Sequence, residues 1–247
     1  MNRRGLLAGC LLLGAMIVLA QAPQPVTTPQ PSAPLLTVVL DAGHGGTDPG
    51  AVGPNLLKEK DLTLDLAKKI KAALSTEVSI NVVLSRTDDT ALTDLARVAI
   101  FNRAKPALMV SLHAGNLPGS ANGFALFCER SAASAEPAQP ATGDFFLWKE
   151  AQAPFLSESL KASLIFQENL IPMFTKLQPT DLPCAFLGVH QVPLAALEGA
   201  ALPALVLELG SLGLPRQADL FKQESYKKEV AGAIASAIKE YFLKRAQ

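Results

Sequence analysis

The stretch that decides the fold is Thr-Val-Val-Leu-Asp-Ala-Gly-His-Gly-Gly, residues 37–46. Its first four residues have strand-like character and run directly into a glycine-rich turn. Gly43, Gly45 and Gly46 tolerate backbone angles that other residues resist, so the chain can bend tightly around His44 and leave its imidazole accessible. A strand that ends in such a turn places His44 at one edge of a sheet, which is a suitable position for a metal ligand.

Three further residues give this histidine a chemical context. His113 ends a second strand-like run at 108–113, and Glu208 ends a third at 204–208, while Glu59 precedes a well-patterned helix. Two imidazoles and a carboxylate are the ligand set of an open catalytic zinc site. A further carboxylate is the proton-transfer group that such a site needs.

Each of these residues also has a plainer interpretation. A histidine beside glycines is often a loop residue with nothing bound. A carboxylate such as Glu59 is favoured at the positive end of a helix without any chemistry. The combination of these residues, rather than any one of them, favours a metal site.

Length and composition limit the architecture and the function. The chain has 247 residues, of which 49% are hydrophobic, and this suits one large α/β domain with a sizeable core. The formal net charge is zero. Because the sequence has no basic stripe with interleaved aromatic residues, we expect no nucleic-acid binding.

Residues 1–22 have the layout of a secretory signal peptide, in which Arg3 and Arg4 precede an apolar stretch that ends in small residues. We therefore expect export to the periplasm or cell envelope, by the general secretory route or by a twin-arginine route. An uncleaved signal anchor is an alternative. Cys10 lies in a segment that resembles a lipoprotein cleavage box, but too few apolar residues precede it, so we do not expect a lipid anchor there.

A Pro-, Gln- and Thr-rich linker is expected at 23–34, followed by a folded domain at 35–247. Strand-like runs alternate there with amphipathic helices, which predicts an α/β domain with a mostly parallel, mixed sheet of about six strands and helices on both faces. In such sheets ligands bind beyond the carboxyl ends of the strands. The expected strands lie at 37–40, 82–84, 107–112, 123–128, 186–190 and 204–208, and the expected helices at 62–74, 92–104, 155–169 and 226–242. The apolar positions of the second helix include Leu95, Ala99 and Phe101.

Residues 129–154 interrupt this pattern. Residues 131–143 are rich in Ala, Ser and Pro, and an apolar cluster at 145–148 that contains Trp148 follows them. We expect the segment to cover a substrate groove, and the alternative is that the cluster only fastens the loop to the core. Asn116 and His190 are further candidates for substrate contacts, although His190 has a structural role as its alternative.

Two cysteines, Cys128 and Cys184, remain if the leader is removed. We expect both to be small buried apolar residues. Pairing in an oxidising compartment is the alternative, but two cysteines do not make a disulfide scaffold in a domain of this size.

A series of short motifs occurs in order along the chain. They are Leu-Asp-Ala-Gly-His-Gly-Gly at 40–46, Asp-Pro-Gly-Ala at 48–51, Glu-Lys-Asp at 59–61, Ser-Arg-Thr-Asp at 85–88, Ser-Leu-His-Ala at 111–114 and Val-Leu-Glu at 206–208. Together they resemble the zinc-dependent N-acetylmuramoyl-L-alanine amidases of the amidase_3 type, over most of the expected domain. The resemblance implies that His44, Glu59 and His113 bind one zinc ion and that Glu208 is the catalytic carboxylate.

The chain also departs from the pattern of that family. Ala42 stands where the family usually has proline, and Gly115 separates the His-Ala pair from Asn116. Leu-Gly-Ser-Leu-Gly at 209–213 replaces the usual Gly-Phe-Leu-Ser-Asn. These departures bear on substrate contacts more than on the chemistry, because every implied zinc ligand and the carboxylate are present.

The resemblance implies hydrolysis of the amide between N-acetylmuramic acid and L-alanine in peptidoglycan by zinc-activated water. One alternative is a catalytically idle peptidoglycan-binding domain of the same fold. Another is a zinc peptidase that acts within the stem peptide, although the chain has no His-Glu-x-x-His helix. We expect a monomer with peptidoglycan as its partner, and the sequence does not identify an activating protein.

Overall fold

The structure of the chain is a computed structural model that describes residues 36–77, 79–115, 117, 122–130, 152–177, 179 and 184–245. The expected signal peptide with Cys10, the linker, Asn116 and Trp148 lie outside these residues, as does most of the segment 129–154. Within the described ranges, no helix combines the length and the apolar character needed to cross a membrane.

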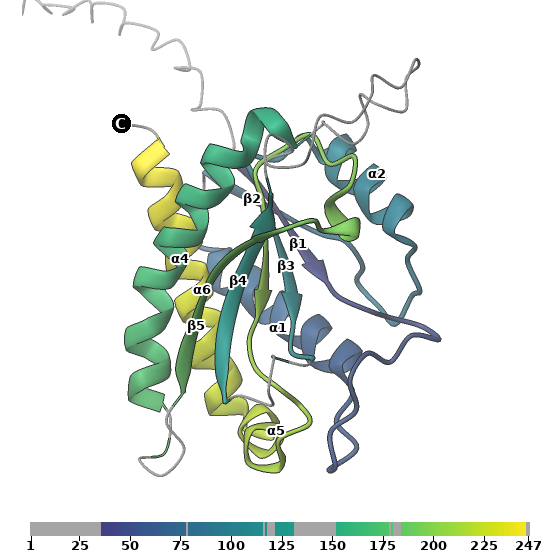
Figure 1. Cartoon of the computed structure of the whole chain (residues 1–247), viewed down its shortest axis with the longest axis vertical. Coiled ribbons are helices and arrows are strands. Elements are labelled where there is room, and N and C mark those ends of the chain that lie inside the picture. Colours follow the sequence, from purple (N-terminus) through teal and green to yellow (C-terminus); the bar gives the residue numbers. More distant parts are fainter. Residues whose placement is uncertain are drawn as a thin grey trace, which may run out of the picture. The chain divides into compact units, whose positions relative to one another are not determined.

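A six-stranded sheet with the order β2-β1-β3-β6-β4-β5 runs through the middle of the fold (Figure 1). Neighbouring strands are parallel except for β4 and β6, which are antiparallel. The predicted mostly parallel, mixed sheet of about six strands is therefore confirmed. The strands are β1 (Leu36–Ala42), β2 (Ile80–Leu84), β3 (Leu108–His113), β4 (Gly123–Glu129), β5 (Ala185–Val192) and β6 (Ala204–Glu208).

Helices cover both faces of the sheet, as predicted. On one face lie α1 (Glu59–Leu74), α4 (Leu156–Leu177) and α6 (Glu224–Arg245), with α4 and α6 side by side (Figure 1). On the other face lie α2 (Asp94–Ala104) and the short 3-10 helix η4 (Ala195–Leu197). The sequence pattern did not predict α5 (Pro215–Lys222), which packs against α6.

Strand β1 contributes to a core on each face. Val38 and Leu40 pack toward α1 and α6, whereas Val39 packs toward α2, and all three are fully buried. A strand buried on both faces has to be apolar throughout, which explains the continuous Val-Val-Leu run. α1 completes the first core through a stripe of apolar residues at a spacing of four: Leu62, Leu66, Ile70 and Leu74.

The expected apolar face of the second helix was wrong in part. Leu95 is 66% exposed, and the buried residues of α2 are Arg97, Val98 and Phe101. The helix starts at Asp94 after the N-cap Thr93 and turns Arg97 toward the sheet, where it forms an ion pair with Asp41. A buried charge with a partner on β1 therefore sets the rotation of α2, and this rotation leaves Leu95 on the outside.

The expected end of the helix that starts near residue 155 was also wrong. α4 continues through Pro172 to Leu177, because Leu170 and Phe174 extend its buried face on both sides of the proline. Phe174 stacks on Phe124 of β4 with ring centroids 4.5 Å apart. This packing offsets the backbone hydrogen bond that a proline removes from a helix interior.

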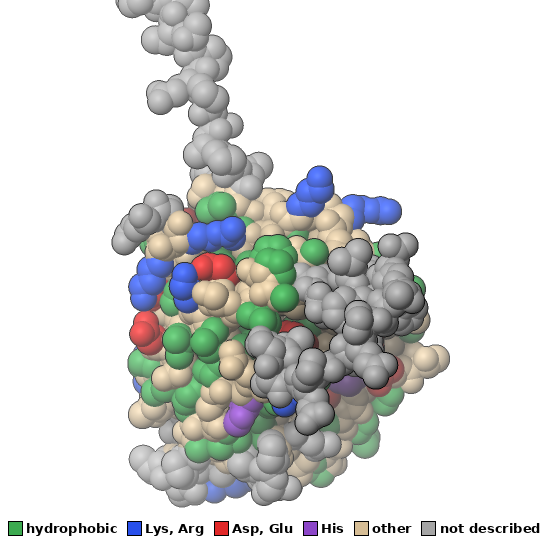
Figure 2. Space-filling model, turned by 45° about the horizontal axis from the view of Figure 1, so that its top comes forward, with side chains coloured by type: hydrophobic (Ala, Val, Ile, Leu, Met, Phe, Trp, Pro, Cys, Tyr) green, Lys and Arg blue, Asp and Glu red, His purple; other side chains and the backbone are tan. Residues whose placement is uncertain are grey.

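Figure 2 shows one face of the molecule, on which basic, acidic and apolar side chains of the described residues are interspersed. Many of the charges are paired on this surface or elsewhere in the described ranges, for example Lys244 with Glu240 at 2.7 Å and Lys161 with Glu158 at 2.7 Å. Exposed pairs of this kind contribute little to stability, about 0–1 kcal/mol each. The fold is therefore stabilised mainly by the two apolar cores.

The two cysteines lie near opposite ends of the β4–β5 pair. Cys128 is the register partner of Gln191, whereas Cys184 directly precedes Ala185, the partner of Gly123. Six strand residues at about 3.3 Å each separate the two positions by roughly 20 Å, and a disulfide needs Cα atoms within about 7 Å. Both thiols are free, and burial raises the pKa of Cys128 and raises that of Cys184 to about 12.

We predict that Cys128 and Cys184 remain unpaired even in protein prepared under oxidising conditions. The protein would be denatured without a reductant, alkylated and mapped by mass spectrometry. Both cysteines should appear as separately alkylated peptides, in the same yield as in a reduced control. A peptide pair linked through these residues would contradict the strand register.

Candidate metal centre

The carboxyl ends of β1, β3 and β6 lie side by side at one end of the sheet, because these neighbouring strands are parallel. His44 follows β1, and His113 and Glu208 are the last residues of β3 and β6. Glu59 is the first residue of α1 and comes to the same end of the sheet. The structure therefore brings together the residues that the sequence placed at separate strand and helix ends.

Three side chains form a cluster with the geometry of a metal site. One donor atom from each of His44, Glu59 and His113 lies within 4.8 Å of the other two. Glu59 Oε1 is 3.2 Å from His44 Nε2 and 3.1 Å from His113 Nδ1. Ligand atoms on a tetrahedral zinc ion with bonds of about 2.0–2.1 Å are roughly 3.3 Å apart. Both the donor types and their spacing therefore fit a zinc ion.

Backbone amides fix the carboxylate of Glu59, which is 1% exposed. Oε2 accepts a hydrogen bond of 2.9 Å from Ala51 N, and Oε1 accepts one of 2.9 Å from Ala114 N. Burial on its own would raise the pKa of Glu59, but the hydrogen bonds from His113, His44 and Ala51 outweigh it and hold that pKa well below its usual range. A helix-start role does not account for a side chain that leaves α1 and reaches the residue after β3.

The ring of His44 is oriented by Asp48. His44 Nδ1 donates to Asp48 Oδ2 at 2.8 Å, which directs Nε2 toward Glu59. A carboxylate on the second ring nitrogen is the usual way in which proteins orient a metal-binding histidine. Glycine is required at position 50, beside the His44 ring, because a Cβ there would lie 2.6 Å from His44 Cδ2 and 2.7 Å from Glu59 Cβ. The backbone of Gly50 also has a φ of +63°, which favours glycine.

Glu208 lies next to His113, its register partner across β3 and β6. Its Oε2 accepts a hydrogen bond of 3.1 Å from Gly115 N, so the residue that departs from the family pattern holds this carboxylate. Burial raises the pKa of Glu208. A carboxyl group with a raised pKa is better suited than an unperturbed one both to accept and to release a proton.

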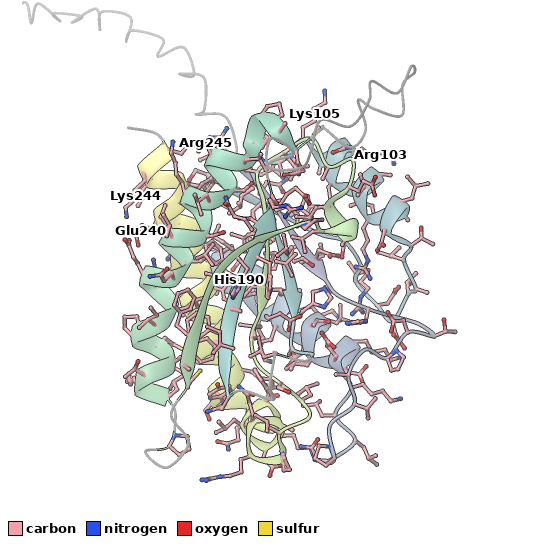
Figure 3. The ribbon with its side chains drawn as sticks, viewed as in Figure 1. Arg103, Lys105, His190, Glu240, Lys244 and Arg245 are labelled. Atoms are coloured by element: carbon pink, nitrogen blue, oxygen red, sulfur yellow. The ribbon has the colours of Figure 1, made fainter. Side chains whose placement is uncertain are left out.

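The structure does not bring His190 to this cluster. His190 is on the edge strand β5, which β4 separates from β6 (Figure 3). Its ring stacks on Phe127 with centroids 5.1 Å apart, and its Nε2 is 3.0 Å from Leu187 O. These contacts agree with the alternative that His190 has a structural role. The other two candidates for substrate contacts, Asn116 and Trp148, lie outside the described residues.

Both described ends of the segment 129–154 are attached near the amino-terminal end of β6, which is the end of the sheet opposite the metal cluster. Glu129 ends β4, which runs antiparallel to β6, and its Oε2 accepts a hydrogen bond of 2.9 Å from Leu194 N. Gln152 Nε2 donates to Ala200 O at 2.6 Å and to Leu202 O at 2.9 Å, just before β6 begins. The expected cover therefore starts and ends away from the metal cluster.

Two buried arginines, to which the sequence pattern assigned no role, support the loop that carries His44. Arg86 and Arg97 are 4% and 5% exposed, and both donate to carbonyl oxygens of that loop. A signal was available for one of them, because Asp41 is an ionisable residue within an apolar strand and has to find a buried partner.

The fold and this donor set define an α/β protein with a three-residue cluster that could hold a metal ion at the carboxyl ends of parallel strands. The family Amidase_3, described as N-acetylmuramoyl-L-alanine amidase, matches residues 38–240. The chain belongs to this family.

Individual relatives agree with this assignment. The chain is 26% identical to the N-acetylmuramoyl-L-alanine amidase AmiC of Escherichia coli O6:H1, over 90% of this chain and 57% of AmiC. It is 28% identical to AmiC of Neisseria meningitidis serogroup B, over 87% of this chain and 56% of that protein. The chain thus spans a little over half the length of these AmiC proteins. The solved catalytic domain of CwlV from Bacillus (Paenibacillus) polymyxa is 28% identical, with a TM-score of 0.66 over 84% of this chain and 98% of that domain.

We predict that the metal-free protein loses stability as the pH rises. In the absence of metal, hydrogen bonds to Glu59 and Asp48 raise the pKa of His44 from 6.5 to about 9, although partial burial opposes this. A raised pKa means that the stabilisation is complete below pH 6.5 and is lost as the pH rises through about 9. Glu59 stays ionised throughout this range, so His44 determines the change.

The measurement is the melting temperature of chelator-treated protein across this pH range at constant ionic strength. The wild type should lose more stability than His44→Asn, whose side chain does not titrate. An equal decrease in both proteins would assign the pH dependence to other groups.

Proposed function

We propose that this protein is a zinc-dependent N-acetylmuramoyl-L-alanine amidase, which cleaves the amide bond between N-acetylmuramic acid and L-alanine of peptidoglycan. The observation that carries the proposal is the contact of one buried, ionised carboxylate, Glu59, with two imidazoles beside a carboxyl group of raised pKa, Glu208. Membership of the Amidase_3 family supplies the identity of the substrate bond.

In this proposal His44 Nε2, Glu59 Oε1 and His113 Nδ1 hold one zinc ion. A zinc ion bound there would polarise the scissile carbonyl and acidify the attacking water. Three protein ligands suit catalysis, because they leave one coordination position for water or substrate. Asp48, Ala51 and Ala114 keep the ligands in place through the hydrogen bonds described above.

Glu208 is the proposed proton-transfer group. As a carboxylate it accepts the proton of the attacking water, and as the acid it then delivers a proton to the amine of the departing L-alanine. Burial suits it to both steps, because a raised pKa makes the carboxylate a better proton acceptor and the protonated form easier to reach than in a free glutamate. The hydrogen bond from Gly115 N orients the carboxyl group through Oε2.

We further propose that the protein acts outside the cytoplasmic membrane, after export directed by residues 1–22. The motivation is the arginine pair and apolar stretch of that segment, together with a substrate located in the cell wall. The folded domain at 35–247 would then be the catalytic domain, following the linker at 23–34.

We predict that the protein lacking residues 1–22 releases stem peptides from purified peptidoglycan. The products should carry a free L-alanine amino group and a free lactyl carboxyl group on muramic acid. A chelator should abolish the release, and added zinc should restore it. Cleavage within the stem peptide would instead indicate a zinc peptidase, and binding without products would indicate an idle wall-binding domain.

We predict that Glu208→Gln keeps bound zinc but decreases kcat about 10²–10⁴-fold, the usual contribution of a general acid–base group. KM should change little, because the carboxylate acts in bond making and breaking. Glu129→Gln is a matched control, since Glu129 is also a strand-end glutamate whose pKa is raised by burial, at the opposite end of the sheet. A kcat close to that of the wild type for Glu208→Gln would assign proton transfer to another group.

A further inference from the structure

A buried arginine links helix α2 to the loop that carries His44. The Arg97 side chain is 5% exposed, and its Nη1 forms an ion pair with Asp41. It also donates from Nη1 to Ala42 O at 3.0 Å and from Nη2 to His44 O at 2.7 Å. Arg97 is therefore hydrogen-bonded directly to the backbone of a candidate zinc ligand.

A second buried arginine extends this arrangement. Arg86 donates from Nε to Ala42 O at 3.0 Å and from Nη2 to Gly43 O at 3.0 Å. The carbonyl groups of three consecutive residues, 42 to 44, thus accept hydrogen bonds from two guanidinium groups. These bonds fix the direction of each peptide plane between the end of β1 and the imidazole.

The backbone of His44 needs such a restraint. Its φ is +62°, in the left-handed region that residues other than glycine seldom adopt. Such a conformation persists only where the surrounding structure holds it. The bond from Arg97 to the carbonyl of His44 and the bond from its ring to Asp48 restrain the backbone and the side chain of the same residue.

The cost of burying the Arg97–Asp41 ion pair suggests that Arg97 serves to orient the backbone rather than to stabilise the fold. Burying a guanidinium is costly, and a buried ion pair often stabilises a fold no more than apolar residues of the same size would. Asp41, held by a 2.7 Å hydrogen bond from Ser111 Oγ, compensates the charge of Arg97. Arg97 supplies two N–H donors to the carbonyl oxygens of Ala42 and His44, and an apolar side chain would supply none.

We propose that Arg97, anchored by Asp41, is a positioning residue that holds His44 in its metal-binding conformation. Zinc affinity then depends on a helix that packs on the face of the sheet opposite α1 and its Glu59. The inference rests on the proposed zinc site, and it goes beyond that site in assigning part of the affinity to α2.

The test compares zinc affinity with the stability of the metal-free protein. Arg97→Met keeps an unbranched apolar side chain and removes the donors, whereas Arg97→Lys keeps the charge but replaces the two donor nitrogens of the planar guanidinium with one. Arg103→Met is the matched control, because Arg103 is an exposed arginine in the last turn of the same helix (Figure 3). Zinc affinity would be measured by competition with a chromophoric chelator, and stability by thermal unfolding in the presence of excess chelator.

We expect Arg97→Met to weaken zinc binding about 10–100-fold, the usual effect of losing a residue that orients a metal ligand. Arg97→Lys should show a smaller loss, and Arg103→Met none. With zinc in excess, kcat of both Arg97 variants should return close to that of the wild type, because Arg97 does not touch the reacting atoms. If Arg97→Met does not fold, Arg97→Lys decides the outcome.

Unchanged zinc affinity in folded Arg97 variants with a lower melting temperature would overturn the inference, because Arg97 would then support the fold alone. Wild type and His113→Ala serve as reference proteins for the metal site itself. If the wild type bound zinc no better than His113→Ala, the proposed zinc site would fail, and this result is distinct from failure of the role of Arg97.

Discussion

The buried carboxylate of Glu59 ties together three parts of the chain that are distant in sequence. It accepts hydrogen bonds from the backbone of Ala51 and Ala114 and contacts the rings of His44 and His113. An ionised carboxylate at 1% exposure would be strongly unfavourable without these partners. The loop after β1, the start of α1 and the end of β3 therefore have to meet around it, and the candidate site exists because they do.

The apolar cores make this meeting possible. The stripe of α1 that begins at Leu62 packs against β1 and β3, and this packing fixes where the first turn of the helix, with Glu59, is placed. The parallel register of β1, β3 and β6 then aligns the strand ends that carry the histidines and Glu208. Charged groups that are costly to bury are thus held in place by the packing of two apolar cores.

Much of the fold and of the candidate site could be predicted from sequence because the signals were local. Strand-like runs that end in His113 and Glu208, and a four-residue apolar period after Glu59, are visible in short windows. Arg97 was missed because its partners Asp41 and His44 lie more than fifty positions away, and because a hydrophobic pattern does not place a charge in the core. The same limitation put Leu95 inside and ended α4 too early, at residue 169, although tertiary packing carries the helix through Pro172. The separation of the cysteines followed only from the register of β4 and β5.

The reversed direction of β4 also determines how far the segment after it must extend. Glu129 and Gln152 are attached near the start of β6, whereas the metal cluster lies beyond its end at Glu208. A segment attached there would reach the metal cluster only by running the length of β6, about 16 Å, and returning. Residues 131–151 have a contour of about 70 Å when extended, roughly twice that round trip. The number of residues between the two attachment points therefore permits contact with a substrate at the metal centre, although both attachments lie at the far end of β6.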